Sequence, residues 1–416
     1  MSAALPASRR FAALRHRDFT IFWGASIVSR VGTQMRDVAL AWQIYLLTRS
    51  PLALGVIGAF RVLPVILFAL WGGAAADSYD RRRMMIAAQT VLAVTSAIMA
   101  VVTAMGAATP AMLYVLTALS GAATAFDSPA RQALVVNMLP EEDLANGLTL
   151  SILGYQVSTV VGPAIGGLLL AATSIEVIYS VDAVSFLAVI GALLVIRPRA
   201  GQGEPAARGG VTFEAVAVGL RFLRTKPLLV WLMVVDFLAT FFAGALLLLP
   251  IFASEVFHVG ERGLGLLAGA PAVGSLLASA WLSYRRPIRR QGLTVLFAIA
   301  AYGGCMLGFG LSTSFPLALL FLAASGAADA VSTVIRQVVR HTITPDELRG
   351  RMTSINMIFF MGGPQLGEVE AGILAQLTSV RVSVVSGGVA CVLVALLVAA
   401  LVPSLRELGR DRAAPA

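Results

Sequence analysis

Charged and polar side chains recur inside long apolar stretches of this sequence, and these residues could carry its chemistry. Arg30, Gln34 and Asp37 are spaced four and three residues apart, so on a helix they would share one face. Asp127 and Arg131 are four apart and could form a local ion pair. The other embedded charges are Arg36, Arg61, Asp182, Asp236, Asp329, Glu368 and Glu370. A charge at the centre of a bilayer costs about 2.5–3.5 kcal/mol, so such residues usually face water or a partner.

Embedded acids beside an arginine can alternate between an ion pair and a protonated form, which is the chemistry of proton coupling. The candidates for this role, in order, are Asp37, Glu368 and Asp236. Arg30 should face an acid from another span, and we expect that acid to be Asp236. Glu368 and Glu370 are two residues apart, so at most one should face a shared cavity.

The elements that position these residues are twelve apolar stretches, each near the roughly 20 residues that a membrane-crossing helix needs. Short turns separate most of them, and the fifth and sixth, like the eleventh and twelfth, are nearly continuous. The predicted spans are 19–47, 52–76, 84–106, 110–130, 147–172, 175–196, 228–256, 263–283, 292–312, 316–335, 352–376 and 381–402.

The composition supports an integral membrane protein. Of 416 residues, 58% are hydrophobic and 13% are charged, whereas soluble proteins carry about 25% charged residues. Of the 31 basic residues, 25 fall in loops or tails on one side of the predicted spans and 3 on the other. This asymmetry predicts that both termini are cytoplasmic. The net charge of +9 is therefore a topology signal and no evidence for nucleic-acid binding.

The spans group into two halves. We expect a cytoplasmic tail at 1–18, a six-helix bundle at 19–196, a cytoplasmic linker at 197–227, a second bundle at 228–402 and a C-terminal tail at 403–416. Within the linker, Phe213, Val216, Leu220 and Leu223 have helical spacing. This spacing favours either a short amphipathic helix on the membrane surface or a solvated linker helix.

The two halves repeat each other at a nearly constant spacing. A shift of 205 residues relates four pairs of segments, and a shift of 201 relates Gly162-Pro163 to Gly363-Pro364. Parallel repeats of six spans are typical of secondary transporters. The pairs related by 205 are Ser120–Ala123 with Ser325–Ala328, Arg131-Gln132 with Arg336-Gln337, Pro140-Glu141 with Pro345-Asp346, and Ser78-Tyr79 with Ser283-Tyr284.

These motifs resemble those of the major facilitator superfamily. The run from Gly73 to Arg83, GAAADSYDRRR, is similar to the signature between that family's second and third spans. The run GPAIGG from Gly162 to Gly167 is similar to a motif of its antiporters, with Ser158 at the first small position. Arg61, Pro64, Asp80 and the run TPDELRGR from Thr344 resemble the branch that holds the enterobactin exporter and macrolide-efflux pumps. The resemblance implies an all-helical fold of two pseudo-symmetric six-helix bundles.

The resemblance also implies roles for the motif residues. Gly73, Asp77, Asp80, Arg81 and Arg82 would form a cytoplasmic gate, in which Asp77 caps the eleventh span and the arginines pair with acids or only set the orientation. Ser158, Gly162, Pro163, Gly166 and Gly167 would pack span five against span eight, or act as generic packing residues. Spans one, four, seven and ten would line the cavity, and six of the ten embedded charges lie on them. Asp182 lies outside these spans and is expected to be structural.

The predicted function is secondary active transport. We expect a monomeric proton-coupled exporter of a siderophore or an amphiphilic drug-like molecule, an antiporter of the bacterial inner membrane that works by rocker-switch alternating access. An importer or a lipid-moving facilitator of the same fold is the alternative. Its partners would be the cargo, protons and the lipid bilayer, with no nucleic acid, cofactor or metal.

Other classes of protein are disfavoured. The three histidines are scattered and no His-Glu-x-x-His motif occurs, which argues against a membrane-embedded enzyme. A P-loop needs Gly-Lys-Ser/Thr, and the single lysine, Lys226, follows Thr225. The two cysteines, Cys305 and Cys391, lie in apolar runs without ligand-like neighbours. A sensor that does not transport remains an alternative, against which the paired signature argues.

Overall fold

The computed structural model describes residues 11–196, 221–284, 288–345 and 349–409, and this part of the chain is helical without strands. Nine of the described helices are long and apolar enough to cross a membrane. The other three predicted spans are also helices, α1 (Arg17–Thr48), α4 (Pro110–Met138) and α13 (Arg349–Leu377), and each carries embedded charges. The predicted all-helical membrane fold is confirmed.

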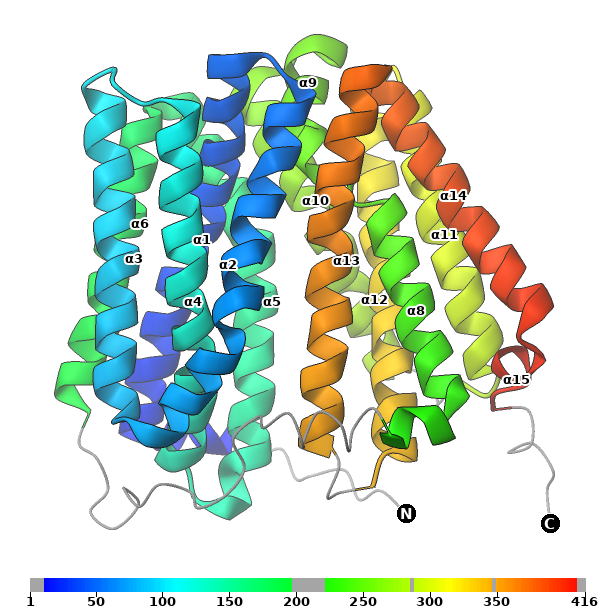
Figure 1. The fold of residues 1–416 in the computed structure, drawn as a ribbon, viewed down its shortest axis with the longest axis horizontal. Helices are drawn as coiled ribbons and strands as arrows, with labels where there is room; N and C mark the ends of the chain where they lie inside the picture. Colours follow the sequence, from blue (N-terminus) through cyan, green and yellow to red (C-terminus); the bar gives the residue numbers. More distant parts are fainter. Residues whose placement is uncertain (1–10, 197–220, 285–287, 346–348, 410–416) are drawn as a thin grey trace. The chain divides into compact units, whose positions relative to one another are not determined.

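Contacts divide the chain into two compact units, Met1–Leu40 with Leu63–Gly210 and Ala41–Val62 with Val211–Ala416. The first unit contains α1 up to Leu40 and the later part of α2 (Pro51–Ser78), followed by four further helices (Figure 1). A short 3₁₀ helix, η2, precedes α1. The bounds are η2 Ala12–Arg15, α3 Arg81–Ala104, α4 Pro110–Met138, α5 Glu141–Ala172 and α6 Ile175–Val195.

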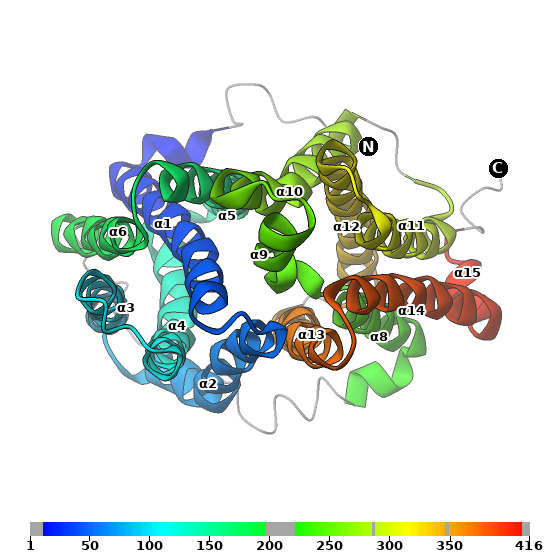
Figure 2. The same ribbon diagram turned by 90° about the horizontal axis from the view of Figure 1, so that it is seen from above.

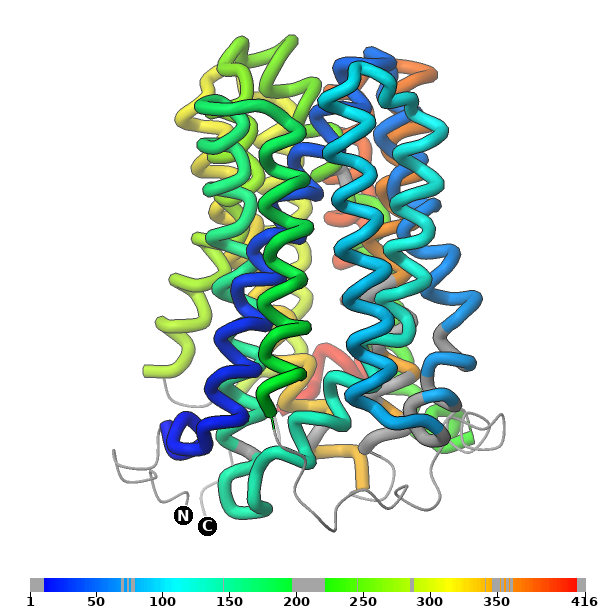
Figure 3. Tube along the Cα trace, turned by 90° about the vertical axis from the view of Figure 1, so that its left-hand side faces the viewer, coloured from blue at the N-terminus to red at the C-terminus, as the bar shows by residue number. Residues whose placement is uncertain are grey.

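Apolar side chains hold the helices of the first unit together. The helix α3 packs against both α4 and α6, and it runs beside α4 in Figure 3. Phe22 of α1, Met85 of α3 and Val189 of α6 belong to one buried cluster, which also contains residues of α4 and α5. The first unit therefore has a continuous core that fixes the polar residues of α1, α3 and α4.

The second unit repeats this plan with α8 and α10 to α14. In Figure 2, viewed along the helices, α13 lies beside α8 and α14 lies beside α11, in agreement with their contacts. The bounds are α8 Pro227–Phe242, η3 Ala245–Leu248, α9 Leu249–Ile251, η4 Phe252–Val256, α10 Gly260–Tyr284, α11 Gln291–Leu311, α12 Phe315–Ile343, α13 Arg349–Leu377, α14 Val380–Leu401 and α15 Pro403–Arg406.

A hairpin from the N-terminal half of the sequence, Ala41–Val62, belongs to the second unit. It consists of the end of α1, the turn at Arg49 and Ser50, and the start of α2. Gly55 of α2 and Gly372 of α13 meet closely, because a Cβ added to Gly55 would lie 3.0 Å from the Cα of Gly372. We call this segment the hairpin below.

Two helices continue well beyond their predicted ends. The spans predicted at 110–130 and 316–335 correspond to α4, which ends at Met138, and α12, which ends at Ile343. Arg131 and Arg336, both assigned to loops by the sequence, therefore lie inside helices. A charged residue ends an apolar run without ending the helix, since backbone hydrogen bonding does not depend on hydropathy.

The seventh predicted span, 228–256, is interrupted rather than continuous. The helix α8 ends at Phe242, and η3, α9 and the π-helical turn η4 complete the span. At the break, a Cβ on Gly244 would lie 3.0 Å from the carbonyl oxygen of Pro364 on α13. The hydroxyl of Tyr302 on α11 donates to the carbonyl of Ala243 over 3.3 Å, so this part of the backbone has a side-chain partner.

Side-chain caps begin several helices where the sequence predicts turns. Asp80 accepts a hydrogen bond from the backbone N–H of Arg83 and starts α3, and Thr109 caps α4 ahead of Pro110. The amphipathic segment predicted in the linker falls mostly at 197–220, outside the described residues.

Candidate functional site

Arg131 is the centre of a buried polar network in the first unit. Its guanidinium lies 2.9 Å from the carboxylate of Asp127, one turn earlier on α4. It also donates to the hydroxyl of Ser26 on α1 over 2.7 Å. The amide of Gln89 on α3 donates to the other carboxylate oxygen of Asp127 over 2.8 Å. The predicted ion pair of Asp127 and Arg131 is present, and it connects three helices.

Arg336 forms the corresponding network in the second unit. Its guanidinium lies 2.6 Å from the carboxylate of Asp236 on α8, and both residues are buried. It also donates to the hydroxyls of Ser332 and Thr333 on its own helix, over 2.8 and 2.9 Å. Thr333 is in turn hydrogen-bonded to Asp329, another predicted cavity residue.

The predicted partner of Asp236 was wrong. The sequence paired Asp236 with Arg30, whereas its cation in the structure is Arg336 of the same unit. Arg336 was overlooked because it sits one residue beyond the apolar run of the tenth span. The 205-residue shift that relates it to Arg131 was the signal that could have identified it.

The two networks are related by the repeat, but their acids come from different helices. In both units an arginine of the fourth helix reaches the first helix, Arg131 to Ser26 and Arg336 to Asp236. In the first unit the acid is Asp127, on the arginine's own helix. Ser332 occupies the aligned position in the second unit. The carboxylate of Asp236 therefore forms its ion pair between helices, whereas that of Asp127 forms its pair within one.

Arg36 and Asp182 form a second buried pair in the first unit. Asp182 on α6 is fully buried, lies 3.5 Å from the guanidinium of Arg36 on α1 and accepts a hydrogen bond of 2.7 Å from Ser96 on α3. Arg36 also lies 3.3 Å from Asp37. Because its partners come from α1 and α3, Asp182 holds the first unit together. This geometry suits the structural role expected for Asp182.

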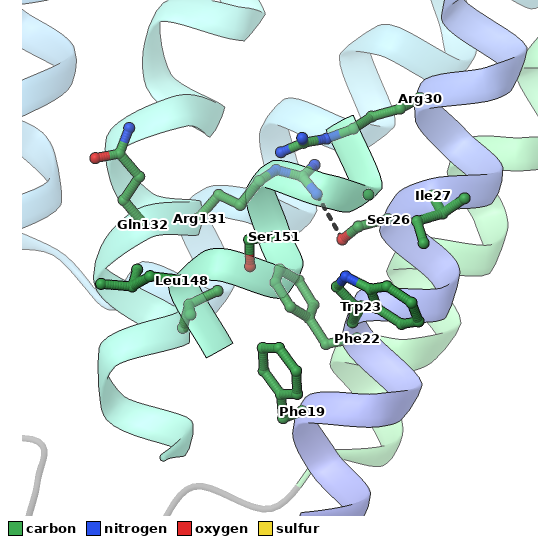
Figure 4. A pocket seen from close by; sticks show the side chains of 12 residues that line it. Phe19, Phe22, Trp23, Ser26, Ile27, Arg30, Arg131, Gln132, Leu148 and Ser151 are labelled. Atoms are coloured by element: carbon green, nitrogen blue, oxygen red, sulfur yellow. Dashed lines mark hydrogen bonds between the residues drawn. The ribbon is translucent and has the colours of Figure 1, made fainter. Parts of the chain in front are cut away.

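An open recess lies in the first unit between α1, α4 and α5 (Figure 4). Two guanidiniums, those of Arg30 and Arg131, lie at one end, and aromatic rings line the other. Arg30 lies over the ring of Tyr155 on α5, 5.3 Å from its centroid. The lining residues are Phe19, Phe22, Trp23, Ser26, Ile27, Arg30, Arg131, Gln132, Val135, Leu148, Ser151 and Gly154.

The small residues of α5 pack against α1. A Cβ on Gly162 would lie 3.0 Å from the carbonyl oxygen of Val31 and would clash with Gln34, and one on Gly166 would lie 2.9 Å from the Cα of Met35. The hydroxyl of Ser158 hydrogen-bonds the carbonyl of Gly154 over 2.8 Å. Within the first unit this motif, which includes the buried Pro163 and Gly167, therefore packs against α1.

The second unit repeats this packing between α13 and α8. Gly363 and Gly367 align with Gly162 and Gly166 under the 201-residue shift. A Cβ on Gly363 would lie 3.0 Å from the carbonyl oxygen of Phe237, and one on Gly367 would lie 2.9 Å from the Cα of Phe241. The same motif thus joins the fifth helix of each unit to the first helix of that unit.

The structure describes part of the predicted gate motif. Asp80 caps α3, and Arg82 donates to the carbonyl of Leu194 at the end of α6 over 3.0 Å. Arg82 therefore contacts a helix C-terminus, where a cation is favoured. Arg81 opens α3. Gly73 and Asp77 belong to α2, but their side chains lie outside the described set.

The hairpin contributes polar contacts that the sequence did not reveal. Tyr45 donates to the carboxylate of Glu255 in η4 over 2.7 Å, and Ser50 donates to Gln376 over 2.8 Å. The predicted residue Glu368 lies at the same seam, because a Cβ on Gly58 would be 2.8 Å from its carboxylate. None of these contacts follows from hydropathy, since they connect segments more than 200 residues apart.

The other predicted residues are more dispersed. Asp37 beside Arg36 has a quarter of its side chain exposed, Arg61 is half-buried on α2 and Glu370 is half-buried on α13. Within the described ranges, no three His, Cys, Asp or Glu side chains come together as a metal ion would require.

Known proteins resemble this chain over nearly its whole length. A family model described as transmembrane secretion effector, of the major facilitator superfamily, matches residues 8–414. The multidrug efflux pump Tap of Mycolicibacterium fortuitum is 27% identical over 92% of this chain and 95% of its own. The enterobactin exporter EntS of Salmonella choleraesuis is 23% identical over 96% of this chain and 95% of its own. The solved structure of a bacterial homologue of the lysosomal transporter Spinster, inward-facing and unoccupied, matches with a TM-score of 0.69 and 16% identity. The match covers 97% of this chain and 99% of the homologue.

Proposed function

The chain belongs to the transmembrane secretion effector family of the major facilitator superfamily, and from that premise we propose that it is a proton-coupled exporter. Membership of this family makes it a multi-pass membrane transporter and not an enzyme, as predicted. The proposal adds the coupling ion, the class of cargo and the cycle.

The proposed cargo is a siderophore or an amphiphilic drug-like molecule. The names of two relatives, an enterobactin exporter and a multidrug efflux pump, support export of this class of compound. We place the protein in the bacterial inner membrane as a monomer with both termini cytoplasmic. The support for this orientation is the asymmetry of the basic residues in the sequence, of which 25 lie in tails or beyond one end of the predicted spans and 3 beyond the other end.

The observation that carries the proposal is the buried ion pair of Asp236 and Arg336. The side chains of Asp236 and Arg336 are 9% and 10% exposed, and they connect α8 to α12 over 2.6 Å. An intramembrane acid paired in this way usually belongs to an ion pathway. Asp236 combines deep burial with an ion pair between two helices, so we assign the coupling to it.

Protonation of Asp236 would remove the charge that holds Arg336 between the two helices. The carboxylate takes up a proton from the side of high proton concentration, the ion pair is lost, and α8 can move relative to α12. Release of the proton to the cytoplasm restores the pair. Coupling follows if the two units alternate access to the cargo site only in step with this change.

In this cycle the two units rock relative to one another. The signature residues Asp77, Arg81 and Arg82 would hold the cytoplasmic side closed, and Arg30, Gln34, Asp127 and Asp329 would line the path of the cargo. The glycines of α5 and α13 would let each fifth helix move as one body with the first helix of its unit.

The test uses everted membrane vesicles with a preformed inside-acid pH gradient. Addition of cargo from a panel of siderophores and amphiphilic drugs should collapse the gradient with the wild-type protein. Asp236→Asn should abolish the collapse, whereas Asp37→Asn, which changes a partly exposed acid, should retain it. If the collapse of the gradient were lost in Asp37→Asn and retained in Asp236→Asn, the coupling residue would be Asp37 and not Asp236. No collapse with any cargo would contradict proton coupling.

Two further variants separate coupling from folding. The double variant Asp236→Asn/Arg336→Gln removes both charges of the pair, and Asp236→Glu keeps the carboxylate. The first should fold but lack coupling, and the second should keep part of it. An importer or a lipid-moving facilitator would give the opposite direction of cargo flux, or none, in whole cells.

A further inference from the structure

The recess between α1, α4 and α5 contains one more positive charge than negative charge. Arg131 is neutralised by Asp127 at 2.9 Å, and that carboxylate is also bound by Gln89. Arg30 contributes a second guanidinium to the same recess. Among the residues that the structure describes, Arg30 has a ring contact with Tyr155 but no ion pair with a carboxylate. Asp127 acts electrostatically on Arg30 as well, but its carboxylate is already paired with Arg131, so two arginines share one carboxylate.

An arginine inside a membrane span without a counter-ion is unfavourable and usually has a function. Stacking on the Tyr155 ring offsets only part of the cost of burying the Arg30 charge, because Tyr155 is itself 51% exposed. Arg30 itself is only partly buried. A ligand that entered the recess could therefore reach its guanidinium and supply the missing negative charge.

The rest of the recess is aromatic. Phe19 and Phe22 are buried, and Arg131 lies 5.6 Å from the centroid of the Phe22 ring. The indole N–H of Trp23 is satisfied by the carbonyl of Leu150 over 2.8 Å. Trp23 therefore presents an apolar surface without an unmet hydrogen bond. In Figure 4 these three rings lie on one side of the recess and the two guanidiniums on the other.

We propose that this recess binds an amphiphilic anion, with its acidic head on Arg30 and its aromatic body against Phe19, Phe22 and Trp23. The head would be a carboxylate, a sulfonate or an ionised phenol. The proposal rests on the proposed export function, because the anion would be the exported cargo. The site would then prefer anions to cations of the same shape.

The experiment measures binding to the full-length protein in phosphatidylcholine nanodiscs, by quenching of tryptophan fluorescence. The probes are three compounds with one aromatic body: 2-naphthoate, the neutral 2-naphthamide and the cationic 2-naphthylmethylammonium. We expect 2-naphthoate to bind about tenfold more tightly than either of the others, because only it can form a charge-assisted hydrogen bond to Arg30. Quenching should fall in Trp23→Phe, which locates the probe.

Substitutions test the role of Arg30. Arg30→Gln should weaken 2-naphthoate about tenfold and leave 2-naphthamide unchanged, and Arg30→Lys should retain most of the preference. Arg83→Gln, which removes an exposed arginine of α3 in the same unit, is the matched control and should bind like wild type. Equal affinity for the three probes, or equal losses in Arg30→Gln and Arg83→Gln, would overturn the proposal. Melting temperatures within a few degrees of wild type would show that each variant is folded.

A phospholipid headgroup could supply the same negative charge, and the nanodisc composition separates the two sources. Replacing a quarter of the lipid by phosphatidylglycerol should leave 2-naphthoate binding unchanged if the site is for cargo. If phosphatidylglycerol weakened 2-naphthoate binding to the wild-type protein but not to Arg30→Gln, the ligand of Arg30 would be a lipid headgroup. That result would overturn the assignment of the anion as cargo. Because binding is measured without a gradient, anion preference without any transport would refute the exporter alone, and transport without anion preference would refute only this proposal.

Discussion

The hydroxyl of Tyr45 donates a hydrogen bond of 2.7 Å to the carboxylate of Glu255, which lies 210 residues further along the chain. Tyr45 is fully buried. Arg49, in the turn that follows α1, donates to the same hydroxyl over 2.9 Å and lies 4.7 Å from the centre of the ring. The hairpin is therefore connected to the second unit by a polar contact as well as by the close approach of Gly55 and Gly372.

Removal of this hydroxyl should loosen the hairpin. Tyr45→Phe keeps the ring but deprives both Glu255 and Arg49 of a partner, and hydrogen bonds to charged groups contribute about 1.5–3 kcal/mol. We expect a lower melting temperature and faster hydrogen–deuterium exchange across 41–62. Tyr79→Phe, at a residue that is 73% exposed, is the control. Unchanged exchange in Tyr45→Phe would show that the apolar seam alone holds the hairpin.

The pair of Asp236 and Arg336 should be strongly coupled in its effect on stability. Removing one partner leaves the other charge buried, which typically costs about 3–5 kcal/mol. We expect Asp236→Asn and Arg336→Gln each to lower the free energy of unfolding by about that amount. The double variant should lose clearly less than the sum, and thermal or denaturant unfolding of the three purified variants measures this. Additive losses would mean that the two side chains do not stabilise one another.

The glycines of α5 should tolerate no side chain. Gly166→Ala places a methyl group 2.9 Å from the Cα of Met35, and overpacking of this kind costs about 1–3 kcal/mol. Gly191→Ala on α6 is the matched control, because nothing lies within 4 Å of its added Cβ. The first variant should melt below wild type and the second at or above it. A stable Gly166→Ala would show that α1 and α5 can separate at little cost.

The two acids beside Arg36 should differ in their effect on stability. Asp182→Asn leaves Arg36 with only the partly exposed Asp37, so we expect a loss of about 3 kcal/mol. Asp37→Asn leaves the fully buried Asp182 in place and should cost under about 1 kcal/mol. Unfolding of both purified variants gives the comparison. The reverse order would place the main stabilising contact of Arg36 on its own helix.

The fold could be predicted from the sequence to a large extent, because the twelve apolar runs and the repeat both report on helices in a membrane. The ends of α4 and α12 could not be predicted this way. Arg131 and Arg336 interrupt the apolar pattern, yet each is satisfied inside the protein by a carboxylate and hydroxyl groups. Hydropathy measures the preference for lipid, and it carries no information about a partner on another helix.

The candidate site was predicted in its residue types and in the pair of Asp127 and Arg131, but not in the partner of Asp236. The acids Asp127, Asp236 and Asp329 all lie in arginine-centred networks. Asp236 was given the wrong arginine because the symmetry argument was applied to spans whose assigned ends excluded Arg336. Tyr45, Glu255 and the hairpin were missed because contacts between the end of α1 and η4 leave no periodic signal in either segment.

The interruption of the seventh span at Ala243 and Gly244 divides one predicted membrane crossing into two helical segments, α8 and the segment that ends with η4. Asp236 lies on α8 and forms an ion pair with Arg336, whereas Glu255 lies on η4 and accepts a hydrogen bond from Tyr45. A rigid rod would force both contacts to break together. In an interrupted span, the proposed protonation of Asp236 would change the tilt of α8 while the hydrogen bond between Glu255 and Tyr45 persists.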